Sequence, residues 1–240
     1  MLFWLEMLTR WKLIRNCQMI WLVLVLAMCL SCGGPVMETK LNGFDQGKRT
    51  LKLNYILNDT TLEDGRKGFK LDTLVHYAVG TKVNHKTERE SFLNEDFSLV
   101  RTTSTARQNE NLARTSAEVK GGKIHVHREA SGKEDLDVEL DHIGPIYIEM
   151  HPLLYYRDLT KPGQSKTYPI LNDEEGQIAS VEIRYVGETQ FYEDNVAHDA
   201  RHYQIQAVTK PDEYDDYYLD PKTGNIIKIE FGYIKFVPAK

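Results

Sequence analysis

The segment Leu51-Lys52-Leu53-Asn54-Tyr55-Ile56-Leu57 decides the fold class, because every odd position carries an apolar side chain. Successive side chains of a strand point to opposite faces of its sheet, so this alternation produces one apolar face. A turn signal at residues 65–68 follows, and the next segment repeats the pattern with an apolar set on one face: Phe69, Leu71, Val75, Tyr77 and Val79. The two segments predict neighbouring antiparallel strands that are each half-buried.

Most of the remaining chain follows the same period of two. We expect further strands at 97–108, 124–129, 136–140, 181–185, 203–207, 217–219 and 226–237. Gly121 and Gly122 separate the apolar positions Val119 and Ile124, and this spacing predicts a tight hairpin turn.

One segment interrupts the alternation. Pro152 suits the first turn of a helix, and Leu153, Tyr156 and Leu159 would lie along one side of that helix. We therefore predict one short helix over residues 152–159. The whole pattern predicts a mainly β fold, in which a strongly curved antiparallel sheet of about nine or ten strands forms an incomplete barrel with the helix as a lid.

The amino-terminal region resembles a bacterial lipoprotein signal peptide. A basic stretch (Arg10, Lys12 and Arg15) precedes an apolar run at 19–30, and Ser31-Cys32-Gly33-Gly34 follows as a lipobox. A run of roughly 12 residues is shorter than the about 20 that a membrane-spanning helix needs. The resemblance implies cleavage before Cys32 and lipidation of its sulfur, for example with palmitate. Cys29 is the alternative modified residue, and an ordinary cleaved signal or an uncleaved anchor is the alternative interpretation.

This resemblance sets the expected domain organisation. We predict a signal peptide at 1–31, a lipidated flexible tether at 32–47 and a single β-rich domain at 48–240. Lipoproteins of this kind carry more than one acyl chain, and two chains hold a protein on a membrane stably. Gly33 replaces the aspartate that retains such proteins in the inner membrane, so we expect the periplasmic face of the outer membrane rather than the inner membrane. Met7 is an alternative start to Met1.

Composition excludes several function classes. Of the three cysteines, Cys17 and Cys29 would be removed with the signal peptide and Cys32 would carry lipid, so the mature body lacks cysteine nucleophiles, thiolate metal ligands and internal disulfides. The chain has 30 Lys and Arg residues against 35 Asp and Glu residues, a formal net charge of −5. An acidic chain is not expected to bind nucleic acid, nor anionic lipid through a broad electrostatic surface.

One pair of histidines has the spacing of a metal site. His125 and His127 share one face of a predicted strand, and two imidazoles can bind zinc or copper if a neighbouring strand adds a ligand. Because Ile124 and Val126 would face the core, we expect both histidines to face water instead.

Two further polar clusters have plain interpretations. In His198-Asp199-Ala200-Arg201-His202 a His–Asp contact could orient a general base, but the chain has no Gly-x-Ser-x-Gly nucleophile motif. Asp212-Glu213-Tyr214-Asp215-Asp216 offers carboxylates for calcium, yet it lacks the glycine and late glutamate of a helix–loop–helix site. We expect a polar bend and a solvated loop, and therefore no catalytic residues, no metal, no cofactor and no enzymatic activity.

Several segments resemble proteins related in fold to the lipoprotein-localisation factors. The resemblance lies in Gly43-Phe44, the strand at 51–55, the block at 151–157 with Pro162-Gly163-Gln164, and the closing hairpin at 216–230. It implies an incomplete antiparallel barrel with a small helical lid. It also implies a concave apolar face that binds the acyl chains of other lipoproteins, or envelope lipids.

We therefore expect a membrane-anchored envelope lipoprotein that binds an apolar or amphipathic ligand, such as a lipid or acyl chain, on its concave sheet. The chain is rich in tyrosines, which either pack within the sheet or line such a groove. The candidate ligand-binding residues are Tyr55, Phe69, Val75, Leu153, Leu154, Tyr156 and Tyr185. The alternative is a scaffold lipoprotein, whose core is filled by its own side chains and whose surface contacts another envelope protein.

Overall fold

The computed structural model describes residues 35–45, 48–79, 83–148, 152–193, 195–209, 213–232 and 234–239. The predicted signal peptide and Cys32 lie outside these residues. Leu153 and Leu154 belong to a described helix, but their side chains lie outside the description. The folded unit comprises Val36–Lys240.

Within the described residues the fold is one antiparallel sheet with one helix. The elements in chain order are β1 (Met37–Asp45), β2 (Lys48–Thr61), β3 (Lys67–Val79), β4 (Val83–Asn94), β5 (Leu99–Gln108), β6 (Asn111–Lys120), β7 (Lys123–Ala130), β8 (Leu136–Asp141), α2 (Pro152–Asp158), β9 (Ser165–Asn172), β10 (Gln177–Glu193), β11 (Val196–Ala207), β12 (Asp215–Leu219), β13 (Ile226–Phe231) and β14 (Ile234–Pro238).

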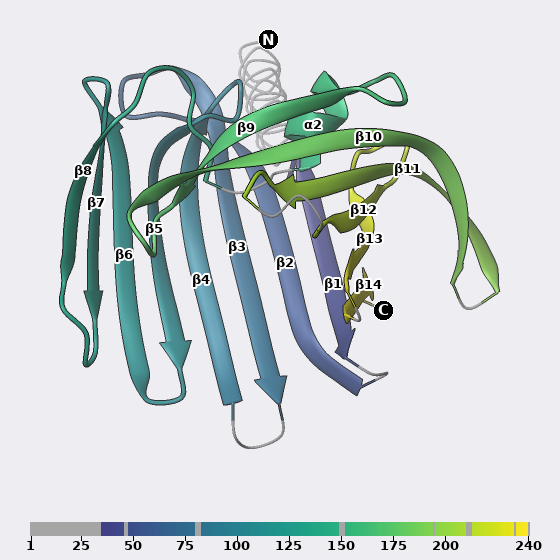
Figure 1. Ribbon diagram of the computed structural model, residues 1–240, viewed down its shortest axis with the longest axis horizontal. Helices are drawn as coiled ribbons and strands as arrows, with labels where there is room; N and C mark the ends of the chain where they lie inside the picture. The colour runs from purple at the N-terminus through teal and green to yellow at the C-terminus, as the bar shows by residue number, and fades with distance from the viewer. Residues whose placement is uncertain are drawn as a thin grey trace, which may run out of the picture. The chain divides into compact units, whose positions relative to one another are not determined.

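Two meanders make up this sheet, β1–β8 and β9–β14. Pairing of β1 with β14, from Leu41 opposite Pro238 to Asp45 opposite Ile234, joins them edge to edge. The strand order is therefore β8-β7-β6-β5-β4-β3-β2-β1-β14-β13-β12-β11-β10-β9, with β8 and β9 as the two edges. Figure 1 shows the sheet curled, so that β9, β10 and β11 cross in front of the upper parts of β2–β5.

The predicted fold class is confirmed, but the strand count is wrong: the described sheet has 14 strands rather than nine or ten. β4 was missed because its inward positions are mostly polar and therefore show no apolar alternation. β1 was missed because it occupies residues 37–45 of the segment for which the sequence predicts a tether. Met37 and Leu41 are buried in the core, so this part of the segment belongs to the sheet.

Local signals were read correctly at two places. Gly121 and Gly122 connect β6 to β7 with φ angles of 62° and 80°, the left-handed conformation that a tight two-residue hairpin requires. The predicted helix is present as α2. Among the described residues, no helix has the length and apolar character needed to cross a membrane.

The helix α2 packs tightly against part of the concave side of the sheet. Its Tyr155 is fully buried, with ring centroids 5.0 Å from Tyr203 of β11 and 6.4 Å from Tyr217 of β12. Tyr203 in turn stacks on Tyr185 of β10 at 4.8 Å. Four tyrosines, Tyr155, Tyr168, Tyr185 and Tyr203, are among the largest fully buried side chains. We call these four residues the aromatic plug.

Candidate ligand-binding site

The strand register divides the concave face of β1–β7 into rows of side chains that run across the strands. One of these rows, which we call the upper row, is buried throughout. Its members are Met37, Leu57, Leu71, Ser91, Thr102, Ala117 and Val126. Ser91 and Thr102 satisfy each other through a hydrogen bond of 2.8 Å between their hydroxyl oxygens. The apolar members of this row and the aromatic plug belong to one hydrophobic core.

The next row along the strands is polar, and we call it the polar row. Its members are Thr39, Tyr55, Thr73, Arg89, Ser104, Thr115 and Arg128. Arg89 donates to Asp173, in the turn between β9 and β10, across 2.8 Å, and the side chains are only 14% and 4% exposed. Arg128 donates to the backbone carbonyl of Glu174 in the same turn. The polar row thus holds the β9–β10 turn against the concave wall.

Gly176 shows how closely this turn approaches the opposite edge of the sheet. A Cβ atom on Gly176 would lie 3.0 Å from Leu136 Cδ2 and 3.4 Å from Val138 Cγ2, both on β8. Its φ of +61° is also a conformation that favours glycine. The turn therefore closes the upper half of the barrel by contact with β8, without pairing of the two edge strands.

Beyond the polar row lie two rows that we call the lower rows. The first consists of Leu41, Leu53, Val75, Thr87, Ala106, Ala113 and Ala130, and the second of Gly43, Leu51, Tyr77, His85, Gln108 and Asn111. Leu41 and Leu53 are buried, but Leu51, Val75 and Tyr77 are half-buried. We call the space over the lower rows the basin. In Figure 1 no strand crosses in front of the lower ends of β2–β6.

The apolar surface of the basin continues onto β13 and β14. The ring of Phe231 lies 6.0 Å from Tyr217 and 5.6 Å from Phe236 in edge-to-face contacts. Phe236 is paired with Gly43, where a Cβ atom would lie 2.8 Å from the Phe236 ring and 2.7 Å from Leu51 Cβ. Only glycine leaves room for the ring there, so the aromatic side chains of β13 and β14 join the apolar ones of β2 without a break.

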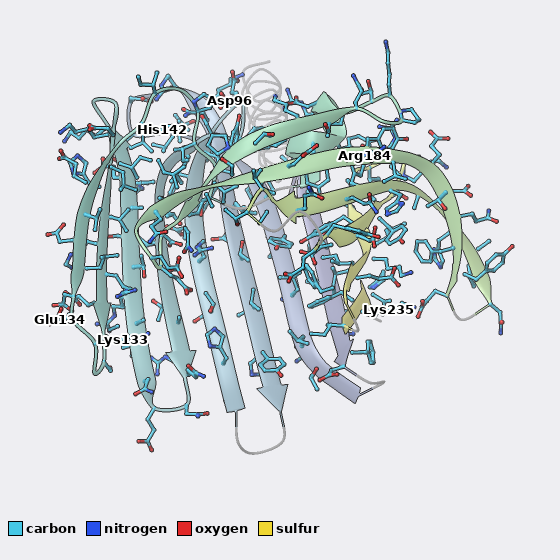
Figure 2. All side chains as sticks on the ribbon, in the orientation of Figure 1. Asp96, Lys133, Glu134, His142, Arg184 and Lys235 are labelled. Carbon is cyan, nitrogen blue, oxygen red and sulfur yellow. The ribbon has the colours of Figure 1, made fainter. Side chains whose placement is uncertain are left out.

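A cavity of about 180 Å³ lies at the β4–β7 side of the basin. Its lining residues are His85, Ser104, Ala106, Gln108, Asn111, Leu112, Ala113, Thr115, Arg128, Ala130, Ser131, Lys133 and Glu174. Three alanine methyl groups of the lower rows form its floor, and charged side chains stand at its edge. Figure 2 shows Lys133 in the loop that follows β7, beside the lower part of β6.

The structure brings two of the predicted ligand-binding residues to this surface. Val75 lies in the first lower row, and Tyr55 lies in the polar row beside it. Leu153 and Leu154 have side chains outside the description, and the remaining three have structural partners: Tyr185 is 2% exposed within the aromatic plug, Phe69 stacks on Phe97 at 4.9 Å, and Tyr156 donates to the Pro221 carbonyl across 2.6 Å.

Sequence reasoning missed the charged members of the site. Arg89 and Arg128 were not singled out, because a charged side chain does not contribute to an apolar alternation, although Arg128 shares its strand face with the buried Ile124 and Val126. For Arg89 one signal was available. Residues 85, 87, 89 and 91 share one face of the strand, and all four carry small or basic side chains, which is a period of two without hydrophobicity. The partner of Arg89 is 84 residues away in the chain, so no local pattern indicates it.

Burial also changes the chemistry of tyrosines in the plug. Burial raises the pKa of Tyr203 to about 12, and its hydroxyl donates to the Leu159 carbonyl across 3.2 Å. Burial raises the pKa of Tyr168 further, together with the neighbouring Asp158 carboxylate, to which its hydroxyl donates across 3.1 Å. These phenols stay protonated at neutral pH and act as hydrogen-bond donors, not as acids or nucleophiles.

Of the other polar side chains singled out in the sequence, His125, His127, His202 and Asp216 lie on the outer face, whereas Asp215 lies on the concave face. His125 and His127 point to water as expected, since each side chain is 49% exposed while Ile124 and Val126 are buried. His202 pairs with Asp216 of β12 across 2.5 Å, not with Asp199. Among the described residues, no group of three or more His, Cys, Asp or Glu side chains could hold a metal ion.

Comparison with known proteins supports the fold. A scan against protein-family models found no match, and a search of the curated proteins found none. Among solved structures, the chain is similar to a β-barrel-like protein of the domain of unknown function DUF1849 from Brucella abortus, with a TM-score of 0.52 and 10% identity over 83% of this chain and 93% of that one. A DUF1089 family protein from Pseudomonas aeruginosa matches with a TM-score of 0.39 and 16% identity, over 73% and 87% of the two chains.

Proposed function

We propose that this protein is a membrane-anchored envelope lipoprotein that binds an apolar or amphipathic ligand, such as a lipid or an acyl chain, in the basin and catalyses no reaction. The observation that carries the proposal is the change in burial along the concave face. The upper row is fully buried, whereas Leu51, Val75 and Tyr77 of the lower rows keep part of their surface in water. A concave apolar surface with a polar border is typical of a binding site.

The position of the ligand follows from the aromatic plug. Tyr155 and Tyr203 are fully buried and pack against each other beneath α2, so the proposal places no ligand in that half of the barrel. The proposal therefore assigns α2 a fixed structural role and places the ligand on the other side of the polar row. There an acyl chain would lie against Val75, Leu51 and Phe231. Burial of apolar surface would favour binding by roughly 25 cal/mol for each Å² removed from water.

The anchor in this proposal rests on the lipobox at Cys32. A tethered protein with an open apolar basin is suited to receive amphiphiles at the membrane surface. The absence of an enzymatic role is proposed because the chain has no Gly-x-Ser-x-Gly nucleophile motif and because Arg89, at the border of the basin, is already paired with Asp173.

Native mass spectrometry of the full-length protein, extracted from membranes in a mild detergent, tests the proposal. We expect a co-purifying lipid or acyl-chain mass on the wild type. Val75→Asn places an amide in the basin and should lower the bound fraction about fivefold or more, because the apolar contact is lost and the amide must be desolvated. Leu74→Asn is the matched control, since the neighbouring side chain points to the outer face. A wild type without bound lipid, or equal effects of both variants, would contradict the proposal.

A scaffold lipoprotein is the second candidate. The self-filled upper half favours it, and so does the tip of the β10–β11 hairpin, where Tyr192 is 70% exposed and Val196 is 55% exposed. Cross-linking in intact cells through residue 192 would support this alternative if it captured one dominant envelope protein while no lipid was found in the basin.

A further inference from the structure

We propose that the cavity between β4 and β7 binds the anionic head group, a carboxylate or a phosphate, of an amphiphile whose alkyl chain lies in the basin. This inference rests on the proposed function and names the class of its ligand. Arg128 and Lys133 would provide the positive charge, and the alanine floor would guide the first methylene groups toward Val75.

The charge of the cavity is the first argument. Arg128 and Lys133 line it together with one carboxylate, that of Glu174, although acidic residues outnumber basic ones in the whole chain. Arg128 contacts the backbone carbonyl of Glu174 and not its carboxylate. Within the part of the chain that the structure describes, neither Arg128 nor Lys133 has an ion-pair partner. A cleft with an uncompensated positive charge attracts anions.

An unsatisfied hydrogen-bond donor is the second argument. The Nε atom of Arg128 is buried and has no hydrogen-bond partner among the described residues. Buried donors are normally paired, so a group of this kind indicates a partner such as a bound ligand or water. A guanidinium presents its donors in a planar fork that matches the oxygens of a carboxylate or phosphate. Arg89, three strands away in the polar row, differs because Asp173 already neutralises it.

The size of the cavity is the third argument, because it decides which part of an amphiphile fits inside. A volume of about 180 Å³ corresponds to roughly six waters at about 30 Å³ each, which suits a head group but not a long acyl chain. The cavity floor at Ala106 and Ala113 continues in the same row to Thr87 and Val75. An alkyl chain that leaves the cavity therefore meets small and apolar side chains until it reaches the aromatic ones of β13 and β14.

Photoaffinity labelling tests the inference on the full-length protein in membrane fragments. The probes are hexadecanoic acid carrying a diazirine in its chain and the corresponding uncharged alcohol, with labelled peptides mapped by mass spectrometry. We expect the acid to label peptides of β3 and β4 about tenfold more strongly than the alcohol, because charge-assisted hydrogen bonds to arginine are strong. Arg128→Gln should reduce labelling by the acid to the level of the alcohol and leave the alcohol unaffected.

Two further variants control for folding and for general charge effects. Lys133→Gln changes an exposed loop residue, so its expected severalfold loss of acid labelling does not depend on the contact that Arg128 makes with the β9–β10 turn. Arg114→Gln removes the same charge from the outer face of β6 and should change nothing.

The possible outcomes distinguish the inference from the proposed function. Equal labelling by acid and alcohol in the basin, unaffected by either cavity variant, overturns the inference while the function stands. No labelling of the basin by either probe overturns both. If acetate or inorganic phosphate competes as effectively as dodecanoate at the same concentration, the cavity binds a free anion. That result overturns its assignment to an amphiphile.

Discussion

The fold raises the pKa of Asp215, and this change can be tested by the pH dependence of stability. It lies on β12 opposite Ile205, on the concave face that also carries Tyr217. Burial, with smaller contributions from Asp216 and Glu213, raises its pKa from the ordinary 3.8 to about 6. The native state therefore holds a proton on Asp215 at pH values where the unfolded chain has released it.

This linkage predicts a pH-dependent effect of Asp215→Asn. Stability of the wild type should fall as the pH rises from about 4 to about 6 and remain lower above that, because the native state binds the extra proton. The variant lacks this loss, so its Tm should exceed that of the wild type by about 2–4 °C at pH 8 and match it at pH 4. Thermal unfolding followed by circular dichroism measures both values. Asp216→Asn, which removes the partner of His202, should bring no gain at pH 8.

A second prediction at the scale of residues concerns the hydroxyl groups of Tyr203 and Tyr155 in the aromatic plug. Tyr203 donates to the Leu159 carbonyl, whereas the buried Tyr155 hydroxyl has no hydrogen-bond partner among the described residues. Tyr203→Phe should cost about 0.5–1.5 kcal/mol, and Tyr155→Phe should be neutral or stabilising. Urea unfolding of the two variants provides the comparison. A larger loss from Tyr155→Phe than from Tyr203→Phe would show that the plug is arranged differently.

At the scale of elements, the β9–β10 turn is the part that closes the barrel. β8 and β9 are the two edges of the sheet and do not pair with each other. The turn instead places Asp173 against Arg89 of β4 and Gly176 against Leu136 of β8. A buried ion pair contributes little net stability by itself, but it specifies where the turn docks, because either partner alone would leave an uncompensated charge.

Removing one partner of this pair should therefore be costly. Arg89→Met leaves the Asp173 carboxylate buried without its cation, and we expect a loss of about 3–5 kcal/mol in the free energy of unfolding. The double variant Arg89→Met with Asp173→Leu removes both charges and should recover most of that loss. Chemical denaturation of the single and double variants gives the coupling energy. Additive losses would mean that the pair does not hold the turn.

At the scale of the whole molecule, the polar row divides the interior of the incomplete barrel into two parts. On the α2 side the aromatic plug fills the space, and on the other side the lower rows stay partly open. The pairing of β1 with β14 makes the lower rows continuous with the aromatic side chains of β13 and β14. The same chain thus has a core that stabilises it and a separate surface available for a ligand.

The proposed attachment of the whole molecule to a membrane is tested at the lipobox that the sequence predicts at Cys32. Cys32→Ser should prevent incorporation of labelled palmitate and move the protein from the membrane fraction to the soluble fraction, because the acyl chains supply the affinity. Fractionation and labelling in parallel measure this. Cys29→Ser should leave both properties unchanged, and the reverse pattern would assign the modification to Cys29. Unchanged fractionation of both variants would remove the lipid anchor from the proposal.

Prediction from the sequence succeeded where one strand or turn carries its own signal. The alternation at 51–57 and the glycines at 121 and 122 depend on neighbouring residues only, and each forms the expected element. It failed for β4, because His85 and Arg89 face inward on a polar row that only the neighbouring strands create. Val75 was found through its alternation. Arg128 was not, although it continues the inward positions of Ile124 and Val126, because a charged side chain adds nothing to an apolar alternation and its partner Glu174 is 46 residues away in the chain.

The sequence by itself determined an antiparallel sheet with one short helix, since a period of two and a proline at a helix start are local properties of the chain. Only the tertiary structure decided which face is filled and which is open. That outcome depends on contacts between distant residues, such as Tyr155 with Tyr203 and Arg89 with Asp173, and on the curvature that brings β9 and β10 over β2–β5. Hydrophobic alternation identifies an inward face, but only packing across the barrel determines how much space that face leaves for a ligand.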